Sequence, residues 1–527
     1  MKKIFLFLFF SFTFSLIKAQ EKTTRDWLHL SNHLEIYSNS ISGSGTGLSS
    51  LTPGTHFSNL LTLNGTGGGY SYNLGFKATD DKTRDIKRYT LTNMEFKLSK
   101  GAFVLNCGDT YESFTQYTNN SLLKGVSLKY ANPTDNSTEI ILLYGLDLPR
   151  WDYLSNEQGF TLTKRNVYGI RAKHNFRNGL SLGINGVNTI DNNYVEISTN
   201  TIEPLYKNTV YSIDLEYIPF EGFTFKLETA KAFTQESVES STTTDHSGTA
   251  LILKAIGDTL IGRITIEYEN VSPDFLTLVG SSIRDREKIK FFWKLNKGKN
   301  FSIFFNCLHY RNNLDGARET TNNFKPEIGC SLVKLFKRQY SSIDLKIQMD
   351  RQSSVNIEAM SNAVTINYRD RFPGSIDNET ALSISNYETR ANIRNSAEYN
   401  VTTSFKKRYS MKTYSLRPLL EFSLWTRNDK INSTTDNRVG YGTGIEVDIP
   451  SYKIKSNVKI NQNSFTPQVG DTITNTTLNI HLNYRLITKI FNYGLVFVKF
   501  ISNNYKSSNV TNSFREYTVS TGLNLEF

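Results

Sequence analysis

The side chains that could do chemistry in this chain of 527 residues are histidines, and two of them have a suggestive spacing. His29 and His33 are four positions apart, which on a helix would place two imidazoles on one face as zinc ligands. The surrounding segment WLHLSNHLEIY alternates like a strand instead, with Leu28 and Leu30 opposite the histidines. No local Ser, His and Asp signature marks a nucleophile beside a base. The sequence therefore predicts no enzyme, no metal and no cofactor.

Two glycine-rich stretches invite comparison with a phosphate-binding loop. They are GSGTG at 43–47 and the three glycines at 67–69. Such a loop needs a strand before it and an amphipathic helix after it. Neither stretch is followed by such a helix, so both are predicted to be flexible turns.

Charged residues form the third candidate group, and they occupy alternate positions of strand-like segments. If those strands close into a barrel, the charged set faces the lumen. Both signs occur, so mutual pairing is expected rather than the single-sign ring that selects one kind of ion. The candidates are Glu95, Lys97, Lys129, Asp214, Glu216, Lys226, Glu228, Glu267, Asp344, Lys346, Glu446, Asp448 and Arg485.

Strands must position these side chains. The clearest strand pattern in the sequence lies at the C-terminal end, over residues 517–527. Alternate residues there are apolar or aromatic on one face and polar on the other, as in a strand with two different faces. The apolar face comprises Tyr517, Val519, Leu523, Leu525 and Phe527, with Thr521 among them. The same alternation recurs at 211–217, 264–269, 343–350 and 478–485.

A terminal strand that stops on an aromatic residue resembles the closing strand of Gram-negative outer-membrane β-barrels. This resemblance implies an all-β, antiparallel, up-and-down barrel in the bacterial outer membrane, formed by residues 21–527. Tyr517, Val519, Leu523, Leu525 and Phe527 would then be the signal read by the barrel-assembly machinery. Outer-membrane lipid and lipopolysaccharide would surround the barrel.

The connections between strands alternate in length, as expected if periplasmic turns are short and outer loops long. Long polar connections are predicted at 233–249, 427–438, 463–475 and 502–513, with short turns between them. Counting through the chain gives about 26 strands, with a range of 22–26 and an uncertain phase between 351 and 400. An even number places both termini in the periplasm.

The start of the chain, MKKIFLFLFFSFTFSLIKAQ, predicts a secretory signal peptide over residues 1–20. Its Ala-Gln junction resembles signal peptides of the Bacteroidota. Removal of Lys2, Lys3 and Lys18 lowers the formal charge from +11 to +8. Basic and acidic residues are interspersed, which favours contacts with anionic lipid head groups over nucleic acid.

Composition agrees with long paired strands. The chain has 28 Tyr and 34 Phe, which suit β-structure and interfacial girdles, and only 11 Pro, which would interrupt a strand ladder. There are three cysteines, Cys107, Cys307 and Cys330. A small and odd number argues against a disulfide scaffold. Free thiols are predicted, with a Cys307–Cys330 pair as the alternative.

The functional prediction follows from the observation that strands and their connections take up almost the whole mature chain. Nothing resembles the N-terminal plug of a TonB-dependent transporter, although barrels of about 22 strands usually need one. The hairpin from Leu105 to Tyr130 is similar to one in fimbrial ushers, over about 25 residues. The first hypothesis is a porin-like channel or uptake pore for small solutes. The alternatives are a non-enzymatic scaffold of an envelope machine (secretion, surface assembly or gliding), with a plug or periplasmic partner protein in its lumen, and a soluble β-rich binding protein.

Overall fold

The computed structural model describes residues 28–81, 90–132, 137–147, 151, 164–192, 204–238, 242–356, 358–390, 393–486 and 492–527. The predicted signal peptide, residues 1–20, lies outside these described residues. No helix among them is long and apolar enough to cross a membrane.

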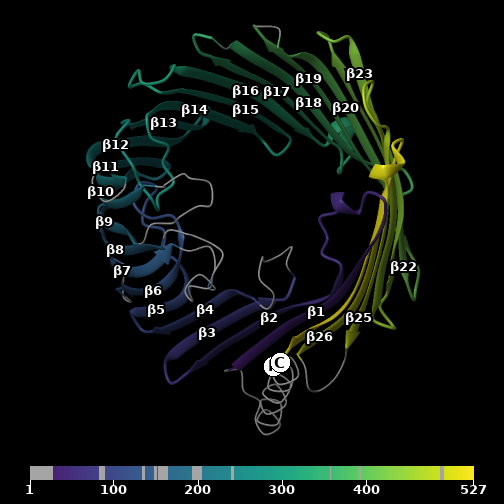
Figure 1. Ribbon diagram of the computed structural model, residues 1–527, viewed down its shortest axis with the longest axis horizontal. Coiled ribbons are helices and arrows are strands. Elements are labelled where there is room, and N and C mark those ends of the chain that lie inside the picture. Colours follow the sequence, from purple (N-terminus) through teal and green to yellow (C-terminus); the bar gives the residue numbers. More distant parts are fainter. Residues whose placement is uncertain are drawn as a thin grey trace.

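The described chain forms one closed antiparallel sheet. Its 27 strands include β21, a two-residue strand within the connection from β20 to β22, so the wall has 26 strands. Strand β1 pairs with both β2 and β27, which closes the ring seen in Figure 1. The prediction of an all-β, up-and-down barrel with about 26 strands is confirmed, including the stretch 351–400 where the phase was uncertain.

The strands follow one another around the ring in sequence order. In the first half they are β1 (Leu28–Gly43), β2 (Gly54–Gly67), β3 (Tyr70–Thr79), β4 (Thr90–Lys100), β5 (Phe103–Tyr111), β6 (Leu122–Ala131), β7 (Thr138–Asp147), β8 (Lys164–Asn175), β9 (Leu180–Asn192), β10 (Leu205–Phe220), β11 (Phe223–Val238), β12 (Thr242–Thr259) and β13 (Gly262–Val271). In the second half they are β14 (Arg286–Lys297), β15 (Phe301–Asn312), β16 (Thr321–Val333), β17 (Ser342–Ser353), β18 (Glu358–Phe372), β19 (Ile376–Thr389), β20 (Asn395–Lys407), β21 (Tyr409–Ser410), β22 (Ser415–Asp429), β23 (Thr434–Ile449), β24 (Ile454–Thr466), β25 (Ile473–Leu486), β26 (Tyr493–Ser507) and β27 (Phe514–Glu526). Short 3₁₀ segments are η1 (Thr46–Leu48), η3 (Leu335–Lys337) and η4 (Val510–Asn512).

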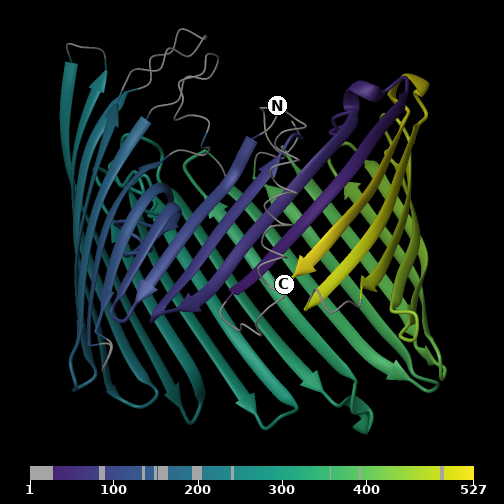
Figure 2. The same ribbon diagram turned by 90° about the horizontal axis from the view of Figure 1, so that it is seen from below.

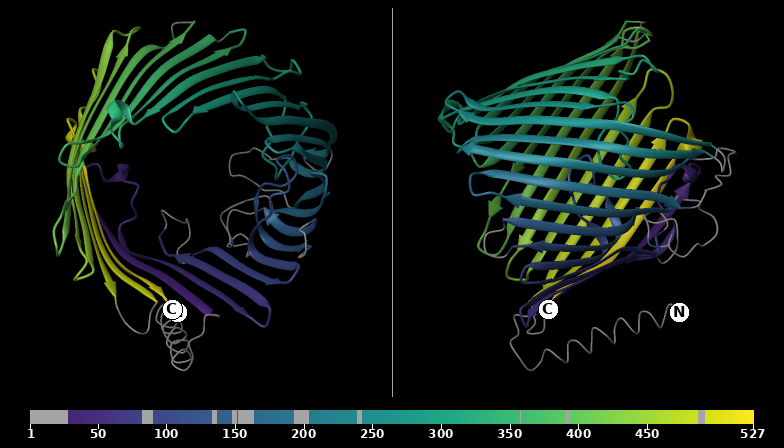
Figure 3. Two further views of the ribbon diagram at one scale, coloured as in Figure 1. Left: turned by 180° about the vertical axis from the view of Figure 1, so that it is seen from behind. Right: turned by 90° about the vertical axis from the view of Figure 1, so that its left-hand side faces the viewer.

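The two rims of the barrel differ. We call the rim where β27 ends the C-terminal rim, and the opposite one the loop rim. The segments η1 and η4 lie together at the loop rim (Figure 2), where the Gly45 amide donates to the Ser513 carbonyl at 3.0 Å. The strands are strongly tilted in the side view of Figure 3, as barrel closure requires.

Inner and outer faces can be assigned from two connections that fold inside the ring of strands, β5–β6 (112–121) and β13–β14 (272–285) (Figure 1). Residues that contact these connections face inward, and their neighbours in sequence face outward. The outward face is apolar and exposed, for example at Ile170 (53%), Ile213 (49%) and Leu142 (46%). A water-soluble wall would not expose so many large apolar side chains over one continuous face.

The strands at the loop rim are longer than the sequence predicted, and this corrects four expected long connections. The expected connection at 233–249 is mostly strand, because β11 continues to Val238 and β12 begins at Thr242. The segments 427–438, 463–475 and 502–513 are shortened in the same way. Polar side chains pair across these extensions: Thr426 donates to Asn437 at 3.0 Å, and Thr435 to Asn428 at 3.2 Å. Such cross-strand pairs stabilise a ladder without apolar residues.

The closing seam is well packed around a glycine. Gly522 of β27 lies opposite Glu35 of β1 and Phe497 of β26. The Phe497 ring is 3% exposed, and a Cβ at Gly522 would lie 2.3 Å from both its Cζ and the Leu34 carbonyl oxygen. The outward set of β27 includes Val519 (49% exposed) and Leu523 (36%), and the Phe527 amide donates to the Leu30 carbonyl at 2.8 Å.

The three cysteines are free thiols, so the alternative Cys307–Cys330 pair is not formed. In register, Cys307 lies opposite Pro326, and Cys330 lies opposite Ile303 and Leu345.

Replacing Gly522 with Val is expected to destabilise the barrel. The new side chain would overlap the Phe497 ring and the β1 backbone, at a cost of about 1–3 kcal/mol. Gly67→Val is the matched control, because nothing lies within 4 Å of a Cβ there. The measurement is the temperature at which the detergent-purified barrel loses its heat-modifiable mobility. Equal midpoints for the two variants would contradict the packing described.

Candidate functional site

The two inward connections, 112–121 and 272–285, contact each other and narrow the ring on one side. The Asn120 amide donates to the Val279 carbonyl at 2.8 Å, and the Ser281 amide donates to the Gln116 carbonyl at 2.9 Å. We call these two connections, with the inner faces of β6–β13 that they cover, the inner constriction. Because its two parts are hydrogen-bonded to one another, it is a single unit.

Aromatic rings anchor the constriction on small residues of the wall. Tyr117 and Phe275 meet edge to face with ring centroids 5.6 Å apart, and both are almost completely buried. Their cluster on the wall consists of Val210, Ala230, Ala232, Ala250 and Val271. A Cβ on Gly248 would lie 2.1 Å from the Phe275 amide nitrogen, so the 272–285 backbone is seated directly on this glycine.

A second apolar cluster holds the 112–121 connection. Phe114 and Val279 are buried there against inward side chains of four strands: Leu123, Ile141, Leu143, Val167 and Val187. Gly169 provides the space, because a Cβ there would lie 2.8 Å from the Phe114 ring. At these positions the wall behind the constriction is apolar on its inner face as well as on its outward face.

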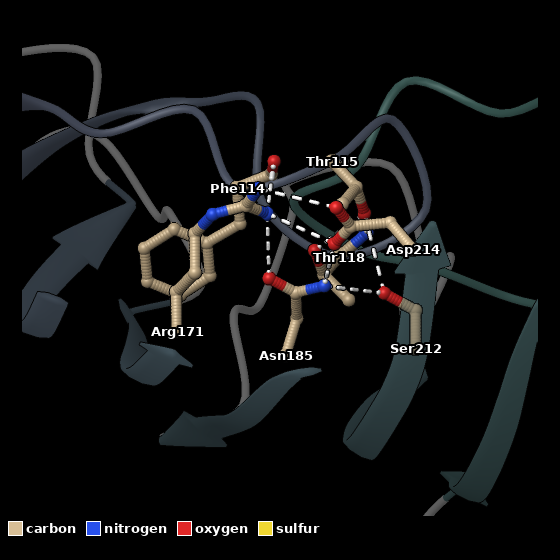
Figure 4. Close-up of polar contacts among 7 residues, drawn as sticks. All are labelled: Phe114, Thr115, Thr118, Arg171, Asn185, Ser212 and Asp214. Carbon is tan, nitrogen blue, oxygen red and sulfur yellow. Dashed lines mark hydrogen bonds and ion pairs between the residues drawn. The ribbon is translucent and has the colours of Figure 1, made fainter. Parts of the chain in front are cut away.

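Hydrogen bonds fix the first connection further, as Figure 4 shows. Arg171 of β8 donates to the Phe114 carbonyl and to the Asn185 side chain, both at 2.7 Å, and pairs with Asp214 at 3.2 Å. Asn185 in turn donates to Ser212 at 3.0 Å and to Asp214 at 2.7 Å. The guanidinium of Arg171 on β8 thus links the Phe114 carbonyl to side chains of β9 and β10.

A chain of ion pairs supports the other side of the constriction. Gln116 donates to Glu269 at 2.9 Å and the Tyr117 hydroxyl donates to the same carboxylate at 3.3 Å. Lys288 pairs with Glu269 at 2.5 Å and with Glu267 at 3.0 Å. Burial and the nearby Glu269 carboxylate raise the pKa of Tyr117, so its hydroxyl keeps the proton that it donates.

The β5–β6 hairpin can turn inward because the pairing of β5 with β4 ends at Gly108, before the end of β5. The two strands share register only from Glu95–Lys100 with Phe103–Gly108. Gly108 has a φ of +100°, which favours glycine, and a Cβ there would lie 2.2 Å from the Met94 carbonyl oxygen. Beyond it, Asp109 accepts a hydrogen bond from the Met94 amide at 2.6 Å, in place of the missing strand partner.

Few of the charged residues predicted from sequence belong to the constriction. Asp214 pairs there with Arg171. Glu267 pairs with Lys254 (3.3 Å) and with Lys288. Glu228 is buried, with 8% of its surface exposed. Other predicted residues have partners elsewhere around the ring: Lys129 with Glu139, Glu216 with Lys226 (2.9 Å), Lys346 with Glu327 (3.9 Å), and Glu446 with Arg417 (3.2 Å) and Lys455 (2.9 Å). Glu95, Lys97, Asp344, Asp448 and Arg485 lie on β4, β17, β23 and β25, outside the constriction.

The sequence prediction missed the residues that hold the constriction. Arg171, Asn185, Glu269 and Lys288 were not singled out, and inward positions were expected to be polar. One signal was present: Ile140, Ile141, Leu142 and Leu143 are apolar at four successive positions, so both faces of β7 are apolar. A strand with two apolar faces must have protein as well as lipid against it.

The chain was compared with protein families, curated proteins and solved structures. No protein-family model and no curated protein matches the sequence. Among solved structures, the P pilus usher (PapC) translocation pore is 9% identical with a TM-score of 0.40, over 94% of this chain and 99% of that chain. The outer membrane transporter YddB from Escherichia coli is 7% identical with a TM-score of 0.46, over 96% and 81%. The outer membrane protein OprD from Pseudomonas aeruginosa is 11% identical with a TM-score of 0.36, over 63% and 91%.

Replacing Arg171 with Met should loosen the 112–121 connection. The change leaves the Phe114 carbonyl without its donor and Asp214 without its cation, at a cost of about 1–3 kcal/mol. The population of the undocked loop should therefore rise roughly 5- to 150-fold. Chymotrypsin cleavage after Phe114 or Tyr117 measures that population.

Two controls separate this effect from general charge loss. The double variant R171M/D214N should be cleaved more slowly than R171M, because D214N removes the buried carboxylate that R171M leaves without a cation. Lys226→Met removes an ion pair whose lysine side chain is 48% exposed, and it should leave cleavage unchanged. Equal cleavage of R171M and the native protein would show that Arg171 does not hold the loop.

Proposed function

We propose that the protein is an outer-membrane channel for small solutes whose wide barrel is narrowed by the inner constriction. The single observation that carries this proposal is the packing of two connections against an apolar inner wall. Barrels of 16–18 strands already leave an aqueous channel, and larger ones need something inside them. Here both buried apolar clusters of the described residues belong to the arc β6–β13, so the chain itself supplies the filling on one side.

The location in the outer membrane is part of the proposal. The exposed apolar outward face supports a lipid environment, with lipopolysaccharide at the loop rim. We assign the C-terminal rim, and with it both termini, to the periplasm. The outward set Tyr517, Val519, Leu523, Leu525 and Phe527 is assigned as the signal for the barrel-assembly machinery, and residues 1–20 as the signal peptide.

The charged residues predicted from sequence are assigned to the lumen wall. They carry both signs, and several form ion pairs across neighbouring strands, such as Glu216 with Lys226 and Glu446 with Lys455. Paired charges of both signs give no single-sign ring, so the channel should discriminate weakly between cations and anions.

A partner protein within the lumen is the second candidate. It is favoured by the confinement of the two apolar clusters to β6–β13, which leaves the arc β14–β27 without a comparable buried core among the described residues. In that case the barrel is a non-enzymatic scaffold of an envelope machine.

Single-channel conductance in a planar bilayer tests the proposal. Gly248→Leu is expected to raise the conductance of the purified barrel, because the new side chain displaces the 272–285 connection from its seat. Gly67→Leu is the control, at a glycine with open space around it. Steps that grow in G248L alone, with a small reversal potential in a salt gradient, support a channel narrowed by the constriction. Silence of both the native protein and G248L, in a heat-modifiable barrel, would contradict it and favour the partner-filled scaffold.

A further inference from the structure

A groove lies on the outward face of the barrel, over strands β6–β10, which form part of the left side of the ring in Figure 1. Its volume is about 520 Å³. Strand register places two rows of outward side chains across it, and we call the row nearer the loop rim the upper row. The upper row is Val126, Tyr144, Tyr168, Asn188 and Thr209. The lower row is Leu128, Leu142, Ile170, Gly186 and Tyr211.

The deepest part of the groove is a hollow at Gly186. This glycine lies opposite Ile170 on one side and Tyr211 on the other, and both of these side chains face outward. A Cβ on Gly186 would lie 3.4 Å from the Tyr211 ring and 3.5 Å from the Ile170 Cγ2. These are ordinary van der Waals distances. The missing side chain therefore leaves a space of aliphatic width between two apolar walls.

The upper row makes one edge of the groove amphipathic. The Tyr144 and Tyr168 rings have their centroids 5.1 Å apart, and both are about half exposed. Beside them the Asn188 side chain donates to the Thr209 hydroxyl at 2.7 Å. Tyrosine is enriched at the boundary between lipid chains and head groups. The groove thus extends from that boundary, on the side of the loop rim, into the apolar belt.

Two lysines face outward next to this edge. Lys231 on β11 lies opposite Tyr211, and Lys207 on β10 is four residues nearer the loop rim than Tyr211. The Lys231 ammonium lies 4.9 Å from the centre of the Phe233 ring, and Phe233 is opposite Thr209, so the ammonium is directed toward the loop rim. Neither lysine has an acidic partner among the residues that the structure describes.

Other outward basic residues near the loop rim do have acidic partners. Arg311 of β15 pairs with Glu287, and Arg351 of β17 pairs with Glu358 at 2.5 Å. A charge on the lipid-facing side of a barrel is costly unless it reaches the interface or an opposite charge. Lys207 and Lys231 therefore have room for an anion from outside the chain.

We propose that the groove binds one molecule of lipopolysaccharide, with an acyl chain in the hollow at Gly186 and a phosphate at Lys207 and Lys231. The proposal rests on the outer-membrane location proposed above. The groove opens to the lipid side, its polar edge is toward the loop rim, and lysines attract anionic lipid head groups.

A second copy of this chain is a poorer occupant of the same groove. A two-fold contact brings the same surface of both copies together. The outward rows described here would then place Lys207 and Lys231 of both copies at one interface, with no carboxylate from those rows between them. Charge complementarity thus favours the phosphate-bearing lipid.

Native mass spectrometry of the detergent-purified full chain, titrated with purified lipopolysaccharide, tests this site. Gly186→Leu fills the hollow, and the double variant K207Q/K231Q removes both cations. Each is expected to weaken binding about tenfold or more, because one variant loses the acyl-chain contact and the other the attraction to phosphate. Gly67→Leu, at a glycine with open space, and Lys506→Gln, at an exposed lysine of β26, are the matched controls and should bind like the native protein.

Two further lipids identify the ligand. Lipopolysaccharide without its phosphates should bind about tenfold more weakly than the intact molecule. Phosphatidylglycerol should not displace intact lipopolysaccharide. The proposal is overturned by equal binding to the native protein and both groove variants, by equal affinity for phosphatidylglycerol, or by a dimer of this chain that dissociates when lipopolysaccharide is added.

The same samples separate this proposal from the channel proposal. The groove is on the outward side of the wall, so G186L and K207Q/K231Q should keep the native single-channel conductance. Native conductance in a barrel that binds no lipopolysaccharide would overturn the lipid site alone. Recovery of the native chain in the inner-membrane fraction would overturn the location on which both proposals depend.

Discussion

Pairing of every backbone amide and carbonyl is the constraint on which this structure depends. In lipid no water can satisfy a free strand edge, so a sheet that crosses the bilayer has to close on itself. The pairing of β1 with β27 meets that constraint, and the match of Gly522 to the Phe497 ring shows how tightly the seam is fitted. Where two strands part early, at Gly108, the Asp109 carboxylate accepts the Met94 amide that would otherwise lack a partner.

A closed barrel of 26 strands has a wide lumen, and two connections of the same chain narrow it from inside. The inner constriction uses the means of an ordinary protein core: buried rings, small residues beneath them, and a guanidinium that satisfies a loop carbonyl. Because Tyr117 and Phe275 are packed against alanines and valines of the wall, the two connections are part of the folded barrel and not mobile flaps. The barrel thereby acquires a narrowed side and an opposite side lined by ion pairs.

The alternation of apolar and polar residues was enough to predict the architecture. Side chains of a strand have a period of two, so the outward sets of β10, β17, β25 and β27 could be read directly, and the turns gave the strand number. The extensions of β11 and β12 were missed because the Ser, Thr and Glu residues of this segment resemble a loop. In the sheet, Glu236 lies opposite Thr244 and Ser237 lies opposite Thr243. The constriction was missed for a related reason. Its contacts join Arg171 to Phe114, and Gln116 to Glu269, over separations that no local pattern encodes.

Amide hydrogen exchange of the lipid-embedded protein tests the central claim most directly. The account predicts that the amides of Asn120 and Ser281, which bond across the two inward connections, exchange as slowly as those of the neighbouring strands β6 and β13. The exposed two-residue turn between β2 and β3, at Gly68 and Gly69, should exchange quickly and serves as the internal reference. Exchange at 112–121 and 272–285 as fast as at that turn would show that the constriction is not packed, and would contradict the account.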